Sequence, residues 1–247
     1  MSARPSGLEA ARRRYQWLAA VYDYDLGQRF LYAQARSRAV ELLRLSPGSA
    51  ILDVACGTGR NFSLIEARIG QTGRLVGVDL TPAMLARARF LVEEQAWNNV
   101  ELIEMDAADL SLGKLVDADV VLPGQRFDAA ISTLGLSVIP EWQRAFKAML
   151  SVVRPGGRIA VMDAGYSKHP RDAGAATVLR PLMAVIARLA AADSTRQPWL
   201  PMINATEDTT IERFAMGYVT VAVGTVKAER PTSVDANARG DSTLHEE

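Results

Sequence analysis

The stretch Ala50-Ile51-Leu52-Asp53-Val54-Ala55-Cys56-Gly57-Thr58-Gly59-Arg60-Asn61-Phe62 decides the fold. Its apolar beginning predicts a buried parallel strand. The glycines that follow break the strand and allow the backbone to pass close to a ligand at the start of a helix. Strand, glycine-rich turn and helix together form the first unit of a nucleotide-binding α/β domain.

The composition is that of a globular protein. The chain has 247 residues, 49% of them hydrophobic and 23% charged, which fits one large α/β domain. Lys+Arg and Asp+Glu number 28 each, and this balance argues against a nucleic-acid partner. A single cysteine and two histidines favour no metal site. No signal peptide or run of ~18 apolar residues is found, so we expect a cytoplasmic protein.

Strands and helices alternate along the middle of the chain. Further buried strands are predicted at 75–79, 100–105, 127–132 and 158–162. Helices are predicted at 82–96 and 141–153, the first with Thr81 as cap and Pro82 at its first position. This alternation predicts a doubly wound, Rossmann-like, mostly parallel sheet with helices on both faces. Strand-like segments at 209–214 and 218–223 raise the total to about seven strands, the last one antiparallel.

The flanks divide the chain into three parts. Helical patterns over 8–21 and up to about residue 45 predict an N-terminal helical lid, residues 1–45, ahead of a core at 46–227. The stretch 107–126 is too mixed to assign, and a loop at 165–172 precedes a helix predicted at 173–192. Residues 228–247 have no periodic apolar face, so we expect a disordered tail.

Polar side chains stand at the carboxyl ends of all five predicted parallel strands. They are Asp53, Asp79, Asp106, Ser132 and Asp163, at the edge where a doubly wound sheet binds its ligand. Asp79 lies 22 residues after Gly57 (79 − 57), close to the ~20 expected for a carboxylate that binds a ribose diol. An acid at position 53 disfavours a phosphate and favours a cationic ligand. Each aspartate alone is equally explained as the cap of the next helix.

The turn resembles the D-x-x-x-G-x-G motif of the class I S-adenosylmethionine (SAM)-dependent methyltransferases. Segments 79–89 and 154–158 also resemble that family, and the likeness covers roughly 46–163. It implies S-adenosyl-L-methionine as cofactor, with Leu80 and Met84 under the adenine. The cofactor-binding residues that it implies are Asp53, Ala55, Cys56, Gly57, Thr58, Gly59, Asn61, Asp79, Leu80, Met84, Asp106, Ala107 and Ser132.

The N-terminal run 15–23 resembles the A-x-x-Y-D segment of quinone and phospholipid methyltransferases, where it forms a lid. The alternative is that its aromatic residues simply pack a pair of helices onto the sheet. An acceptor that needs a base would find one in Tyr22, Tyr166 or His169. The first fifty residues hold eight arginines, which a solvated helix face or peripheral contact with anionic lipid explains: Arg4, Arg12, Arg13, Arg14, Arg29, Arg36, Arg38 and Arg44.

These features favour methyl transfer by in-line displacement to a small-molecule or lipid acceptor, in enzyme class EC 2.1.1. N-methylation is favoured, because an amine needs only to lose its proton before attack. C- or O-methylation of a quinone or natural-product scaffold is the alternative. An NAD-dependent oxidoreductase is disfavoured, because the third glycine of G-x-G-x-x-G is missing. A non-catalytic SAM-binding protein is disfavoured by the intact ligand positions.

Overall fold

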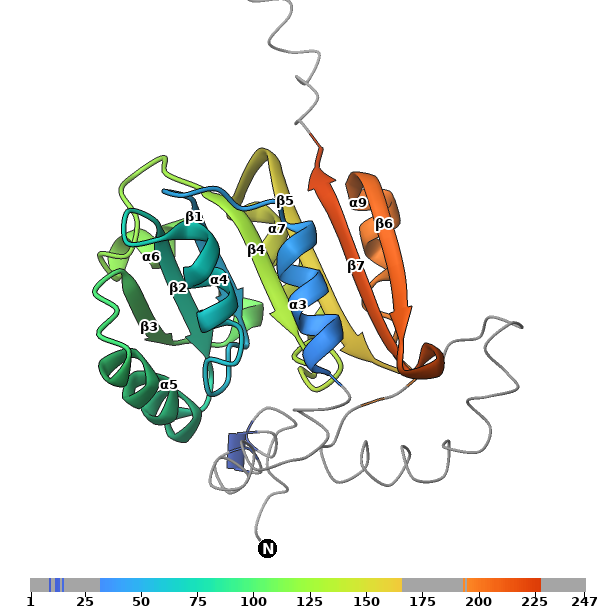
Figure 1. The fold of residues 1–247 in the computed structure, drawn as a ribbon, viewed down its shortest axis with the longest axis horizontal. Helices are drawn as coiled ribbons and strands as arrows, with labels where there is room; N and C mark the ends of the chain where they lie inside the picture. Colours follow the sequence, from blue (N-terminus) through green and yellow to red (C-terminus); the bar gives the residue numbers. More distant parts are fainter. Residues whose placement is uncertain are drawn as a thin grey trace, which may run out of the picture.

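The computed structural model describes residues 32–165 and 195–227, together with Glu9, Arg12, Arg13, Tyr15 and Asp193. Its centre is a seven-stranded sheet with the order β3-β2-β1-β4-β5-β7-β6 (Figure 1). The expected number of strands is confirmed. The strands are β1 (Ala50–Val54), β2 (Arg74–Asp79), β3 (Val100–Glu104), β4 (Phe127–Thr133), β5 (Val153–Ala164), β6 (Thr206–Phe214) and β7 (Val219–Val226).

The first five strands pair in parallel, and β7 runs antiparallel to both of its neighbours, β5 and β6. The predicted mostly parallel sheet with an antiparallel last strand is therefore confirmed. In β1, Asp53 lies between Gly77 of β2 and Ile131 of β4. The first predicted ligand residue is thus in the middle of the sheet.

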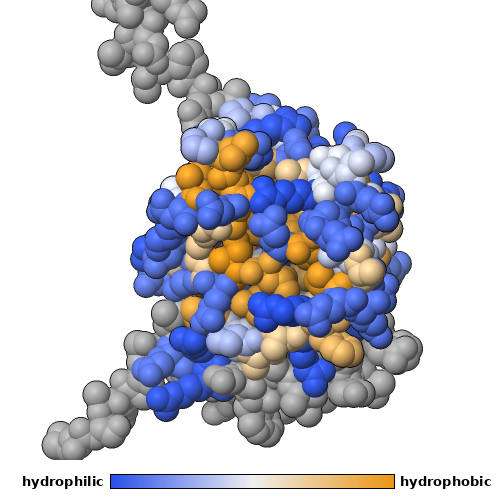
Figure 2. All heavy atoms as spheres, turned by 90° about the vertical axis from the view of Figure 1, so that its left-hand side faces the viewer, coloured by the Kyte–Doolittle hydropathy of each residue, from blue (hydrophilic) through white to orange (hydrophobic). Residues whose placement is uncertain are grey.

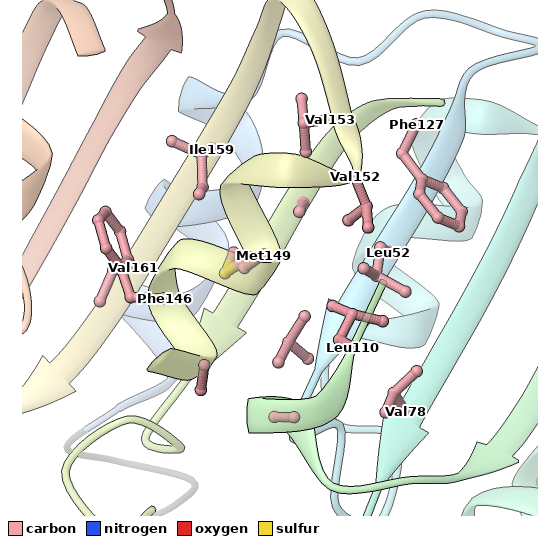
Figure 3. Close-up of a cluster of buried hydrophobic side chains, with 14 of the residues drawn as sticks. Leu52, Val78, Leu110, Phe127, Phe146, Met149, Val152, Val153, Ile159 and Val161 are labelled. Carbon is pink, nitrogen blue, oxygen red and sulfur yellow. The ribbon is translucent and has the colours of Figure 1, made fainter. Parts of the chain in front are cut away.

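Helices cover both faces of the sheet, because successive strand residues point to opposite sides. Ile51 packs into the cluster with α3 (Ala33–Leu42), α4 (Phe62–Ile69) and α5 (Pro82–Glu94). Leu52 packs into the cluster on the other face, with α6 (Leu112–Asp117), α7 (Trp142–Ser151) and α9 (Leu200–Ala205). Figure 3 shows this second cluster, in which Phe146 and Met149 of α7 lie against the sheet. The doubly wound architecture is confirmed.

Helix α3 packs as part of the body of the protein. Its Ala35, Ala39 and Val40 are buried in one cluster with Val221 and Val223 of β7. Residues 33–42, which the sequence analysis placed in the lid, thus cover the sheet. Most of residues 1–31 lie outside the described residues, so a lid formed by them stays a prediction. The helix predicted at 173–192 and the tail at 228–247 also lie outside the described residues.

Strand β5 begins five residues earlier than predicted. Phe127 pairs with Val153, but Ala129 already pairs with Arg158, so residues 154–157 form a bulge inside the strand. Glycine is required there, since a Cβ on Gly157 would lie 2.7 Å from the carbonyl oxygen of Asp128. In the unassigned stretch 107–126 the structure forms η1 (Ala107–Asp109) and α6.

The outer strand β3 carries paired charges. Glu101 accepts from Arg74 at 2.9 Å, and Glu104 accepts from Arg12 at 2.7 Å. Figure 2 shows this side of the molecule, with hydrophobic residues in the middle and hydrophilic residues around them. Charged side chains on an edge strand disfavour pairing with another sheet.

Over the described residues, none of the helices has the length and apolar character needed to cross a membrane.

Candidate functional site

An open cleft lies at the carboxyl ends of β1 to β4 and encloses about 730 Å³ of empty space, part of it continuous with solvent. The strand order changes direction between β1 and β4, which is where open α/β sheets bind their ligands. The turns after all four strands line the cleft. Their residues are Ala55, Gly57, Val78, Asp79, Leu80, Thr81, Met84, Met105, Asp106, Ala107, Thr133, Leu134, Gly135, Val138, Ile139 and Pro140, joined by Arg12 and Tyr15.

Asp79 is the best-anchored polar group of the cleft. One carboxylate oxygen accepts the backbone N–H of Gly57 at 2.9 Å and the other accepts that of Thr81 at 2.8 Å. Burial raises the pKa of Asp79, and these backbone hydrogen bonds oppose the rise. A carboxylate has about four lone-pair sites, and the Thr81 hydroxyl and the Leu80 N–H also lower the pKa of Asp79, so a ligand hydroxyl would share this acceptor with them. The capping role and the ribose-binding role are therefore compatible.

Gly57 leaves the space beside Asp79 open. Its φ is +58°, and a Cβ built on it would have no atom within 4 Å. A ligand can therefore approach the backbone at this turn. The carboxylate acceptor of Asp79 and the free space beside Gly57 both fit a ribose and its neighbouring groups.

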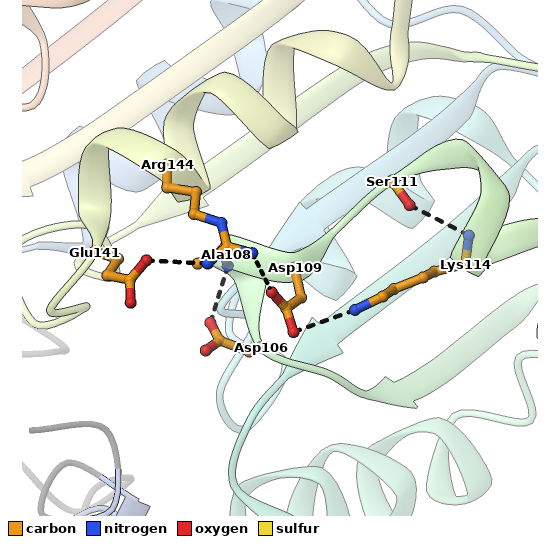
Figure 4. A network of polar contacts seen from close by, with 7 residues as sticks. All are labelled: Asp106, Ala108, Asp109, Ser111, Lys114, Glu141 and Arg144. Atoms are coloured by element: carbon orange, nitrogen blue, oxygen red, sulfur yellow. Dashed lines mark hydrogen bonds and ion pairs between the residues drawn. The ribbon is translucent and has the colours of Figure 1, made fainter. Parts of the chain in front are cut away.

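Asp106 also acts as a cap. Its carboxylate accepts the N–H of Ala108 at 2.9 Å at the start of η1 (Figure 4). Asp109, at the end of η1, forms two exposed ion pairs: its carboxylate lies 2.6 Å from the guanidinium of Arg144 and 3.1 Å from the ammonium of Lys114. These contacts fix the position of η1, which brings Ala107 to the cleft.

Seven of the thirteen cofactor-binding residues implied by the resemblance line the cleft, and their contact with the cofactor stays a prediction. They are Ala55, Gly57, Asp79, Leu80, Met84, Asp106 and Ala107. Three others belong to the turn itself but point into the protein or are enclosed by it: Cys56, Thr58 and Gly59. Burial raises the pKa of the Cys56 thiol well above its usual value, which fits a packing role. Gly59 is required for packing, since a Cβ there would lie 2.8 Å from Phe62.

Asp53, Asn61 and Ser132 do not line the cleft, and their contact with the cofactor stays a prediction. Asp53 is fully buried and accepts two hydrogen bonds, at 3.0 and 2.9 Å, from the amide nitrogen of Asn61. Its carboxylate is thus bonded to Asn61 in the interior of the protein. The Ser132 hydroxyl is buried without a hydrogen-bond partner in the described part of the chain.

The sequence analysis missed the apolar wall of the cleft, residues 133–140. Two side chains outside the cleft form hydrogen bonds with the backbone of this wall. Asp163 accepts the N–H of Ser137 at 2.8 Å, and Arg196 donates to the carbonyl oxygen of Ile139 at 2.5 Å. Burial raises the pKa of Asp163 to about 6, against the hydrogen bonds from Ser137 and Ala164. The signal in the sequence was the apolar composition of the run, which has no helical or strand period.

The three predicted catalytic residues are Tyr22, Tyr166 and His169, and they lie outside the described residues. Two residues of the N-terminal segment, Arg12 and Tyr15, do reach the cleft. Tyr15 begins the run 15–23 that resembles a lid segment, whereas Arg12 was expected on a solvated face or at a lipid surface.

Comparison with known proteins identifies the family. A model described as "Methyltransferase domain" matches residues 51–157. Phosphatidylethanolamine N-methyltransferase of Cereibacter sphaeroides is 33% identical over 190 residues, which cover 76% of this chain and 79% of that protein. Demethylmenaquinone methyltransferase of Listeria welshimeri is 30% identical over 140 residues, 57% of this chain and 55% of that protein. The chain thus spans about half the length of several curated relatives that it matches.

Solved structures of methyltransferases have a similar fold. A SAM-dependent methyltransferase from Aquifex aeolicus has a TM-score of 0.55 at 14% identity, and the match covers 85% of this chain and 98% of that one. The chain belongs to the SAM-dependent methyltransferases, as its resemblance predicted.

Proposed function

We propose that the chain transfers the methyl group to the amino nitrogen of a lipid or small-molecule acceptor. The observation that carries this proposal is the apolar wall at 133–140. No titratable side chain stands on it, and the titratable residues among those described in the cleft are Asp79, Asp106, Arg12 and Tyr15. An amine attacks once it has lost its proton, whereas a phenol or a carbon acid needs a base in place.

The longer of the two curated relatives' matches reported above supports the same acceptor class. The phosphatidylethanolamine N-methyltransferase aligns with 76% of this chain, well beyond the 107 residues of the matched domain (157 − 51 + 1). The additional aligned length includes regions outside the cofactor-binding turns. An aminophospholipid is therefore the acceptor that we propose first.

Different residues of the cleft would bind the cofactor and orient the acceptor. Bound SAM supplies a methyl group made electrophilic by its sulfonium. We propose that Asp79 accepts hydrogen bonds from the ribose hydroxyls and that Leu80 and Met84 pack against the adenine. The wall at 133–140 orients the acceptor and excludes water. Catalysis then comes mainly from proximity and orientation, which needs no acid–base pair.

A second candidate is methylation of a quinone ring, at carbon or oxygen. The demethylmenaquinone methyltransferase relative favours it. This reaction requires a base, and Tyr22, Tyr166 and His169 remain the predicted groups for that role. The two candidates therefore differ in their dependence on these three residues.

We also propose that the N-terminal segment covers the cleft and contacts an anionic lipid surface. Arg12 and Tyr15 at the cleft support a cover, and the exposed Arg12 and Arg13 support the lipid contact. Deletion of residues 1–24 leaves α3 in place, so it should give a folded protein that has lost turnover and sediments less with anionic vesicles. Turnover at the full-length rate would contradict the cover.

Radiolabelled SAM with vesicles of phosphatidylethanolamine, or with a demethylated naphthoquinone in detergent, tests the acceptor. We expect label in the phospholipid and a product heavier by one methyl group on nitrogen, detected by mass spectrometry. Label in the naphthoquinone alone, abolished in Tyr22→Phe, Tyr166→Phe or His169→Gln, would replace the first candidate with the second.

A further inference from the structure

Helix α3 places a guanidinium inside the protein. Arg36 is 6% exposed, although it belongs to the arginine-rich stretch for which a solvated face was expected. It faces the sheet from the same side of α3 as Ala35 and Ala39, which are completely buried. A buried charge is costly without compensation, so its partners define its role.

Four side chains from four different elements meet at this point. Arg36 of α3 donates from Nη1 to Asn61 Oδ1 at 2.8 Å and to Thr133 Oγ1 at 2.6 Å. The amide nitrogen of Asn61 in turn donates to both oxygens of Asp53 and, at 3.2 Å, to Thr133. The cation of Arg36 and the carboxylate of Asp53 are thus bridged by one amide. Both charges lie in the interior.

The positions of these partners connect the network to the cofactor site. Asn61 is the residue at which α4 begins, directly after the glycine turn of the cleft. Thr133 is the last residue of β4 and lines the cleft where the apolar wall begins. One guanidinium is therefore bonded to both sides of the cleft, through a helix that belongs to the N-terminal part of the chain.

We propose that Arg36 is a positioning residue for cofactor binding, which acts through Asn61 and Thr133 to hold the turn at 55–59 and the wall at 133–140 in the separation that SAM requires. This assignment depends on the location of the cofactor in the cleft. Arg36 itself does not line the cleft, so it would act on the cofactor site through Asn61 and Thr133, which border it.

Electrostatics provide a signature for this role. Burial raises the pKa of Asp53 to about 7, the Asn61 hydrogen bond and the charge of Arg36 lower it, and nearby Asp79 raises it. The groups that bear on Asp53 are therefore Arg36 on α3, Asp79 on β2 and the neutral Cys56 of the turn. Loss of the Arg36 charge must raise the pKa of Asp53 further. Any pH dependence that arises from Asp53 should then move to higher pH.

The test is calorimetric titration with S-adenosylhomocysteine between pH 5.5 and pH 8.5 on wild type, Arg36→Met, Arg36→Lys and Arg38→Met. Arg38 is a matched control, because it stands on the same helix and pairs with Glu212 away from the cleft. We expect Arg36→Met to bind about tenfold more weakly, with the midpoint of its pH profile moved upward. Arg36→Lys retains the charge but not the forked geometry, so its midpoint should stay while its affinity falls.

Arg38→Met should match wild type in both respects. A folded Arg36→Met with wild-type affinity and an unchanged pH profile would overturn the proposal. If Arg36→Met does not fold, Arg36→Lys decides: wild-type affinity in that variant would equally overturn it. Failure of the wild type to bind S-adenosylhomocysteine would instead refute the location of the cofactor, and is seen before any variant is compared.

Discussion

The two sides of the cleft are built in different ways. At the ends of β2 and β3, Asp79 and Asp106 each accept a backbone N–H group from their own turn, and Asp79 also accepts that of Gly57 in the turn after β1. On the other side, the wall at 133–140 is apolar and is held by residues that follow far along the chain, Asp163 and Arg196. The first side is organised by hydrogen bonds within and between the turns at neighbouring strand ends, and the second by side chains that come from further along the chain.

This difference separates two functions. The carboxylate side offers fixed acceptors for a polar cofactor, and these are supplied by strand ends that the fold itself creates. The wall offers shape and apolar surface, which suits recognition of the acceptor. Changes on the first side should therefore alter cofactor affinity, and changes behind the wall should alter the handling of the acceptor.

The largest expected effect concerns the buried carboxylate behind the wall. The pKa of Asp163 is raised from 3.8 to about 6, so the folded protein binds a proton that the unfolded chain releases. Its stabilising contribution is complete below about pH 4 and is lost as the pH rises through 6. Two pKa units correspond to about 3 kcal/mol in the free energy of unfolding.

Asp163→Asn should remove this dependence. Denaturant unfolding of wild type and variant from pH 4 to pH 8 measures it, and the stability of the variant relative to wild type should increase with pH. Asp128→Asn, at an exposed ion pair with Arg154, serves as the control. A relative stability that does not change with pH would show that Asp163 does not hold the wall as a titrating group.

Asp79→Ala tests the carboxylate side. It should weaken binding of S-adenosylhomocysteine by about 2 kcal/mol, roughly thirtyfold, because the ribose hydroxyls lose a charged acceptor. The N–H groups of Gly57 and Thr81 also lose theirs, so the melting temperature should fall as well. Calorimetry and thermal unfolding are needed together. Normal affinity with a lowered melting temperature would leave Asp79 with only its capping role.

A close contact joins the two sides, and Gly135→Ala disturbs it. A Cβ on Gly135 would lie 2.7 Å from the Cβ of Ala55, which itself has a φ of +56°. We expect a loss of roughly 1–2 kcal/mol in unfolding free energy from overpacking. Ala55→Gly should recover part of the loss in the double variant, since glycine tolerates that backbone better. Purely additive effects in denaturant unfolding would contradict this contact.

Arg196→Met should have the smallest effect. The variant loses the hydrogen bond to Ile139, which stabilises the position of the wall by about 1 kcal/mol. KM for the acceptor should therefore increase roughly fivefold. The affinity for S-adenosylhomocysteine should be unchanged. Steady-state kinetics with vesicles and calorimetry separate the two. A weaker cofactor affinity with an unchanged KM would reverse the proposed division between the two sides.

The same difference explains what the sequence predicted. Asp79 and Asp106 were found because each ends an apolar strand and precedes a turn, which is a local pattern. The wall was not predicted, because its apolar residues have no helical or strand period. Its anchors lie 26 residues away for Ser137 and Asp163, and 57 for Ile139 and Arg196. Asp163 has the local pattern of a strand-end carboxylate, but nothing local identifies Ser137 as its partner or marks Arg196.

Arg36 and Asp53 show the same limit for charged residues. The arginine was expected on a solvated face, but it is buried because Thr133 and Asn61, 97 and 25 residues further along, accept its hydrogen bonds. Asp53 was expected to face a cationic ligand, but its position in the middle of the sheet directs it to Asn61. Residue type predicted a polar role in both cases, and only the packing reveals the partner.

Calorimetric titration of the wild-type chain with S-adenosylhomocysteine, and separately with NAD⁺, tests the central claim most directly. The claim is that the carboxylate side of the cleft holds SAM. We expect one site with micromolar affinity for S-adenosylhomocysteine and no heat of binding for NAD⁺. Tight binding of NAD⁺ without binding of S-adenosylhomocysteine would contradict it.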